Sequence, residues 1–174
     1  GCSYSFKPAL HLGVSLRSFR SEKLAKFVKL LLDNEPNAAA AVYSELSIHY
    51  PIVLTRDLDK AKKWIREKAR GTERYGLLAS SEGKRLRGIG IWVPSVINHV
   101  GWFLNEKDNV DSSYFLEVAA SEFKVQGLEI DYSILAWDAD LRRSGEGFDY
   151  FKFRGTRWNH VNNAQQQKYL KNAY

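Results

Sequence analysis

Apolar residues in the first third of the chain recur at steps of three and four, which is the spacing of one face of a helix. The first such series follows Ser21, a residue type that caps helix N-termini, and it ends at Asp33 and Asn34. Its apolar members are Leu24, Phe27, Val28, Leu31 and Leu32. A second, alanine-rich helix is predicted over residues 36–48, because Pro36 suits the first turn of a helix.

The rest of the chain predicts one helix, several strands and then a final helix. Residues 57–70 have an amphipathic pattern that Gly71 ends. Residues 80–110 are predicted to be mostly loop, since glycine and proline interrupt the pattern there. Residues 148–154 alternate aromatic and polar side chains, as a half-exposed strand does, and residues 163–174 are predicted to be helical. The short apolar runs predicted as strands are residues 52–55, 75–79, 114–119 and 130–137.

This alternation of strand and helix predicts an α/β fold in a single domain over residues 1–174. Continuous apolar strands favour an open, mainly parallel sheet with helices on both faces. In such sheets ligands bind beyond the carboxyl ends of the strands. The segments expected along that edge are residues 55–56, 79–81, 120–126 and 138–140.

Composition narrows the class of protein. The 26 Lys and Arg residues exceed the 20 Asp and Glu residues and give a formal charge of +6, which favours a partner that carries phosphates. No apolar run approaches the roughly 20 residues of a membrane-spanning helix, so we expect no membrane partner. The single cysteine, Cys2, rules out an internal disulfide and fits a reducing compartment, so we expect the cytoplasm.

Two absences complete the composition. The sequence has no methionine, which indicates a piece of a longer protein. Its histidines have no metal-ligand spacing and Cys2 has no neighbouring ligand, so we expect no bound structural metal. The histidines are His11, His49, His99 and His160.

Several segments resemble the second RecA-like domain of superfamily-one helicases, which is the second lobe of a P-loop NTPase. Residues 15–21, Ser-Leu-Arg-Ser-Phe-Arg-Ser, are similar to motif IV, with Arg20 on its arginine. Residues 121–131, Ser-Glu-Phe-Lys-Val-Gln-Gly-Leu-Glu-Ile-Asp, are similar to motif V. The narrower likeness, carried by residues 54–58, 73–81 and 85–87, is to a bacterial helicase-like family related to the helicase portion of Schlafen proteins.

The resemblance implies roles for these residues. Arg20 would reach the terminal phosphate of the nucleotide, and an arginine that stabilises phosphoryl-transfer charge is worth roughly 10³–10⁵ in rate in GTPase systems. Gln126, Gly127 and Glu129 would face the nucleotide, where a glycine lets the backbone approach a ligand. The expected contacts to single-stranded DNA or RNA are Thr55, Arg56, Ser80, Ser81, Arg85, Arg87 and Ser121.

The chain lacks other parts of a helicase motor. It has no Gly-x-x-x-x-Gly-Lys-Ser/Thr phosphate loop and no paired-acid magnesium motif in the required context. In the resembled family these belong to an N-terminal RecA-like domain of the same protein, and motif VI is expected after Tyr174. ATP and Mg²⁺ are therefore cofactors expected of the longer protein, with neither bound tightly by this chain. The chain alone is expected neither to hydrolyse ATP nor to unwind a duplex.

Other interpretations stay open from the sequence. Arg20 suits a surface ion pair, Gly127 an ordinary turn, and the tryptophans a core. The order of Asp111, Glu122 and Lys124 is that of metal-dependent nucleases, provided that Glu122 and Lys124 lie on a strand. A non-catalytic interaction domain that keeps the RecA-like fold is a third possibility.

Overall fold

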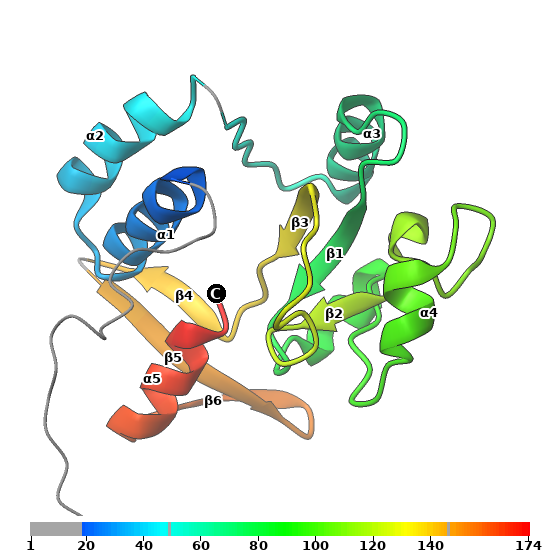
Figure 1. The fold of residues 1–174 in the computed structure, drawn as a ribbon. Coiled ribbons are helices and arrows are strands. Elements are labelled where there is room, and N and C mark those ends of the chain that lie inside the picture. Colours follow the sequence, from blue (N-terminus) through cyan, green and yellow to red (C-terminus); the bar gives the residue numbers. More distant parts are fainter. Residues whose placement is uncertain (1–18, 49, 146) are drawn as a thin grey trace, which may run out of the picture. The chain divides into compact units, whose positions relative to one another are not determined.

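The computed structural model describes residues 19–48, 50–145 and 147–174 (Figure 1). The described residues fall into two compact units, which divide between Val53 and Leu54. The described part of the first unit contains a pair of helices, α1 (Phe19–Leu32) and α2 (Pro36–Leu46). No helix among the described residues has the length and apolar character needed to cross a bilayer.

The two helices of the first unit run antiparallel. Phe27 of α1 contacts Tyr43 of α2 with ring centroids 5.6 Å apart, and Lys23 Nζ lies 2.9 Å from Glu45 Oε2. Asn34 makes the tight turn between the helices with a positive φ of 61°, a conformation that asparagine tolerates better than most residues. Both predicted helices are confirmed.

The second unit contains a small parallel sheet. It has three strands in the order β2 (Ala119–Ser121), β1 (Tyr75–Ala79) and β3 (Tyr132–Ala136). Helix α3 (Leu58–Lys68) precedes the sheet in sequence, and the Asp57 side chain caps it by accepting a hydrogen bond from the Lys60 backbone N–H.

Helices lie on both faces of this sheet. Trp64 of α3 packs edge-on against Tyr132, with ring centroids 6.4 Å apart. Successive residues of a strand point to opposite faces, so Gly76 faces away from Tyr75 and its partner Tyr132. On the face of Gly76, Trp102 of α4 (His99–Leu104) lies so close that a Cβ on Gly76 would be 2.8 Å from the indole.

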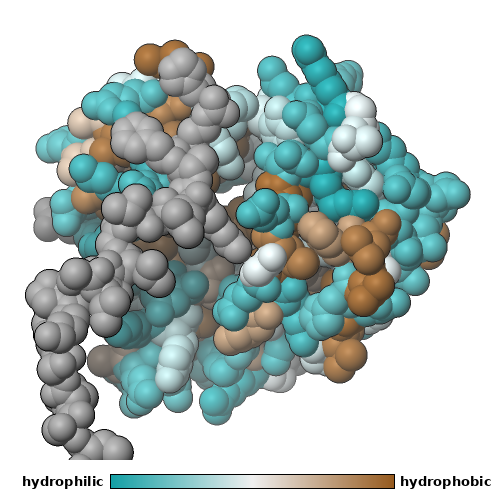
Figure 2. All heavy atoms as spheres, viewed as in Figure 1, coloured by the Kyte–Doolittle hydropathy of each residue, from teal (hydrophilic) through white to brown (hydrophobic). Residues whose placement is uncertain are grey.

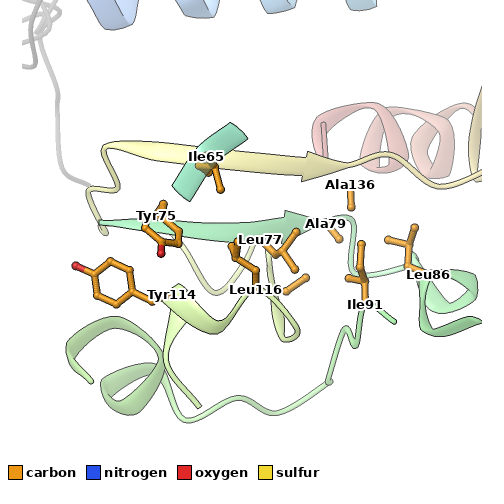
Figure 3. Close-up of a cluster of buried hydrophobic side chains, with 10 residues drawn as sticks. Ile65, Tyr75, Leu77, Ala79, Leu86, Ile91, Tyr114, Leu116 and Ala136 are labelled. Carbon is orange, nitrogen blue, oxygen red and sulfur yellow. The ribbon is translucent and has the colours of Figure 1, made fainter. Parts of the chain in front are cut away.

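The apolar core of the second unit surrounds the central strand β1 (Figure 3). Ile65 of α3, Leu77 of β1 and Leu116 all have no exposed surface. The other buried members of this cluster are Tyr75, Ala79, Leu86, Ile91, Tyr114, Ala119 and Ala136. Two of them, Leu86 and Tyr114, come from the 3₁₀ helices η2 (Lys84–Ile89) and η3 (Ser113–Phe115).

A second sheet follows in sequence and is antiparallel. It consists of β4 (Leu141–Ser144), β5 (Gly147–Arg154) and β6 (Arg157–His160), with β5 in the centre. The final helix is α5 (Ala164–Asn172).

Several predicted elements are wrong in detail. Residues 52–55 form no strand, and Leu54 is 97% exposed, because no neighbouring strand pairs with this segment. Residues 113–115 are a 3₁₀ helix, and the predicted strand 114–119 is replaced by β2, which begins at Ala119. The fold is α/β as predicted, but its strands form two sheets and not one: a small parallel sheet and a separate antiparallel sheet.

Candidate functional site

The three parallel strands of the second unit end level with one another. Ala79 of β1 is in register with Ser121 of β2 and with Ala136 of β3. The segments that leave the three strands therefore start at one rim of the sheet. We call these segments, residues 80–87, 122–129 and 137–140, the carboxyl edge.

A glutamate joins two of these segments. Glu122 accepts hydrogen bonds from the Ser81 backbone N–H at 2.9 Å and from the Ser81 hydroxyl at 2.7 Å, so both carboxylate oxygens are engaged. Ser80 has no exposed surface, and its hydroxyl accepts the Glu82 backbone N–H at 3.2 Å. Ser121 is 6% exposed. Ser80 and Ser121 therefore act within the fold, where they help to fix the shape of the edge.

Two aspartates at the end of β3 hold the third segment. Asp138 accepts the Arg85 backbone N–H at 3.3 Å, which links the β3 and β1 segments. Asp140 has no exposed surface and accepts a hydrogen bond from the Tyr174 hydroxyl. Burial raises the pKa of Asp140, while hydrogen bonds from Tyr174 and Ser80 act in the opposite direction. The Oδ2 atom of Asp140 is buried and has no hydrogen-bond partner among the described atoms.

The segment similar to motif V contains an exposed turn after β2. Gln126, Gly127 and Glu129 are all exposed. Gly127 has a φ of +86°, a conformation that favours glycine, and no atom lies within 4 Å of where its Cβ would be. The Leu128 backbone N–H closes the turn by donating to the Val125 carbonyl at 3.0 Å. The turn thus offers open backbone to a ligand.

The predicted cationic contacts of the second unit are exposed. Arg85 and Arg87 lie on η2 at the carboxyl edge, and the Arg85 guanidinium also lies 5.0 Å from the centre of the Phe153 ring. Thr55 and Arg56 are exposed in the segment before α3, where the Thr55 hydroxyl accepts the Asp57 backbone N–H at 3.1 Å. The structure thus brings Arg85 and Arg87 to the same rim as Ser81.

Arg20 lies in the other unit. It is the second residue of α1, and its side chain is outside the described part of the chain. Its role toward a nucleotide stays a prediction.

The structure does not meet the geometric requirement of the nuclease interpretation. Glu122 and Lys124 lie in the turn after β2 and not on a strand. Asp111 lies in another turn, where its backbone N–H donates to Asn109 Oδ1 at 2.9 Å. Across residues 19–48, 50–145 and 147–174, no group of three or more acidic, histidine or cysteine side chains is placed to hold a metal ion.

The sequence pattern predicts residues 138–140 at the edge, but it does not predict that Asp140, Tyr174 and Glu122 organise this edge. Two acids directly after an apolar strand were the available signal for Asp140. Tyr174 carried no signal, because its contact with Asp140 spans 34 residues of sequence.

Comparison with known protein families identifies the family to which the chain belongs. Residues 2–174 match the family described as Schlafen group 3, DNA/RNA helicase domain. The chain belongs to this family. This match confirms the predicted relationship to a helicase-related family. No curated protein and no solved structure matches the chain.

Proposed function

We propose that this chain is the second RecA-like lobe of an ATP-dependent helicase or translocase that acts on single-stranded DNA or RNA. Membership of the Schlafen group 3 helicase-domain family supports a helicase-like function. The observation that carries the proposal is the carboxyl edge, where three parallel strands end level and exposed arginines follow. Open α/β sheets bind their ligands at this rim.

On the nucleotide side, Arg20 and the exposed turn of Gln126, Gly127 and Glu129 would meet a nucleotide held by an N-terminal RecA-like domain of the same protein. A guanidinium is a permanently charged donor suited to phosphate oxygens. The exposed backbone at Gly127 supports close approach, because no side chain intervenes. ATP and Mg²⁺ would be bound mainly by the partner lobe, so this chain alone would not turn over ATP.

On the nucleic-acid side, four exposed residues would contact the phosphate backbone: Thr55, Arg56, Arg85 and Arg87. Ser81 would contribute its position more than its hydroxyl, since that hydroxyl already donates to Glu122. The buried Ser80 and Ser121 would support the edge from beneath. Phosphate contacts of this kind give binding without base preference and with strong dependence on salt.

Binding of a fluorescein-labelled oligothymidine or oligouridine, measured by anisotropy over a range of salt concentrations, tests the strand contacts. Arg85→Gln/Arg87→Gln should reduce the slope of log K against log salt by about 1.4, which is roughly 0.7 for each lost phosphate contact. Arg143→Gln/Lys168→Gln removes the same charge from exposed positions on β4 and α5 and should leave the slope near wild type. Equal slopes for both double variants would count against a strand site at this edge.

A further inference from the structure

The turn between β5 and β6 carries two arginines directly opposite each other. Arg154 and Arg157 are cross-strand partners that flank the turn residues Gly155 and Thr156, and all four residues are exposed. Like charges opposite each other in a sheet are destabilising. Among the described residues, neither arginine has a salt-bridge partner with an acid. The fold therefore maintains an unfavourable pair of cations at this tip.

The hairpin is fastened to the carboxyl edge just behind that tip. Lys152 Nζ lies 2.7 Å from Glu82 Oε1, and the Arg85 guanidinium lies over the Phe153 ring at 5.0 Å. Both Glu82 and Arg85 belong to the segment that leaves β1. The tip arginines are thus held beside the rim that carries Arg85 and Arg87.

Side-chain contacts hold β5 and β6 together next to the tip. Phe153 and Trp158 are cross-strand partners whose rings meet at 5.2 Å, and the Arg142 guanidinium lies 5.0 Å from the Trp158 ring. These contacts hold the two strands together up to the residue before the turn. The arrangement therefore fixes the backbone on which Arg154 and Arg157 stand.

The charge of this segment matches a polyanion. Residues 141–160 contain five Lys and Arg residues but only two acids, Glu146 and Asp149. Two guanidiniums that flank a two-residue turn suit the evenly spaced phosphates of a nucleic-acid strand.

We propose that the β5–β6 tip is a second strand-binding element, in which Arg154 and Arg157 bind backbone phosphates of single-stranded nucleic acid that continues from the carboxyl edge. This inference rests on the proposed strand binding at that edge. It adds a contact that the helicase motifs do not include. Binding at the tip requires neither nucleotide nor the partner lobe, so this chain is sufficient to test it.

The sharpest test changes only the charge within the turn. Thr156→Asp places an anion between the two arginines, whereas Thr156→Asn has nearly the same shape and no charge, and both residue types are favoured in turns. Anisotropy with labelled oligothymidine and oligouridine should show Thr156→Asn binding as wild type does and Thr156→Asp binding several-fold more weakly at low salt. Equal affinities for these two variants would overturn the proposal.

A second pair of variants measures the two arginines directly. Arg154→Gln/Arg157→Gln should lower the salt slope by about 1.4 and the affinity at 0.1 M salt by roughly 25-fold. Arg154→Lys/Arg157→Lys keeps the charge and should retain most of the affinity. An affinity loss equal to that of the Arg143→Gln/Lys168→Gln control would mean that net charge alone matters. That result would contradict a binding element at the tip.

Further measurements distinguish binding at the β5–β6 tip from binding at the carboxyl edge. Weakened binding in Arg85→Gln/Arg87→Gln with unchanged binding in the tip variants would remove the tip and keep the edge. A wild-type chain that binds no oligonucleotide would end both. Inorganic phosphate should displace the oligonucleotide no better than chloride does at the same ionic strength. If polyglutamate binding depends on Arg154 and Arg157 as strongly as oligonucleotide binding does, the tip is a general polyanion surface. That result would overturn the assignment to nucleic acid.

Discussion

The Tyr174 hydroxyl donates a hydrogen bond to the buried carboxylate of Asp140 and accepts the Asp138 backbone N–H at 3.1 Å. The Tyr174 ring also stacks on Trp137, with centroids 4.4 Å apart. One side chain after α5 thereby fixes the segment that leaves β3. The carboxyl edge is held in shape by a residue far from it in sequence.

Tyr174→Phe keeps the ring and removes the hydroxyl. Because a buried carboxylate then loses a donor, we expect the free energy of unfolding to fall by about 1.5–3 kcal/mol in urea titrations. Tyr169→Phe is the matched control, since Tyr169 is near α5's end and 65% exposed. It should change stability by less than about 0.5 kcal/mol. Similar effects of the two changes would contradict the role of Tyr174.

Asp140 predicts a pH dependence. Burial raises the pKa of Asp140 above its ordinary value of 3.8, so the folded chain binds this proton more tightly than the unfolded chain. The contribution of Asp140 to stability is therefore most favourable below pH 3.8 and declines as the pH rises through the higher folded value. The unfolding free energy of Asp140→Asn should rise relative to wild type across that window. Denaturation curves with a constant difference between the two proteins at each pH would exclude this titration.

Gly76 is predicted to be required by packing. A Cβ at this position would meet Trp102 Cζ2 at 2.8 Å and Cη2 at 2.9 Å, and the indole is buried. We expect Gly76→Ala to lower stability by about 1–3 kcal/mol through overpacking. Gly88→Ala has open space around the new methyl group and serves as the control in thermal denaturation. Near-equal melting temperatures for Gly76→Ala and wild type would show that Trp102 does not press on this strand.

Gly127 is predicted to be required by backbone conformation and not by space. Its φ is +86° and nothing lies within 4 Å of a Cβ. Gly127→Ala should therefore cost about 1–2 kcal/mol, the penalty of a left-handed conformation. Gly127→Asn should cost less, since asparagine enters this region more readily. An alanine variant as stable as wild type in chemical denaturation would indicate that the turn relaxes freely.

Helical periodicity was a strong guide in this chain because amphipathic faces leave a local signal. The predicted helices over residues 57–70 and 163–174 correspond to α3 and α5, and the strand at 75–79 matches β1 to the residue. The run at 52–55 was misleading, because a short apolar stretch looks alike whether or not a neighbouring strand pairs with it. Whether a strand forms at Leu54 is decided by distant residues.

The antiparallel sheet shows the same limit. Its central strand β5 is predicted from alternation, but β4 and β6 are only four residues long and have no long apolar run. Their pairing with β5 is set by the turns at Gly145 and Gly155, both with positive φ. At the site, sequence could indicate the exposed turn at Gly127, whereas the bonds of Ser81 to Glu122 and of Tyr174 to Asp140 join residues 41 and 34 positions apart.

The most direct test of the central claim is ATP turnover by a polypeptide that carries this chain together with the proposed N-terminal RecA-like domain, measured with saturating single-stranded nucleic acid. We expect Arg20→Ala to lower the turnover rate by about 10³-fold or more while the strand still binds, because the transition-state charge loses its guanidinium. Arg143→Gln, an exposed arginine on β4, should leave the rate unchanged. Equal turnover by wild type and Arg20→Ala would contradict the assignment of this chain as the second lobe of an ATP-driven motor.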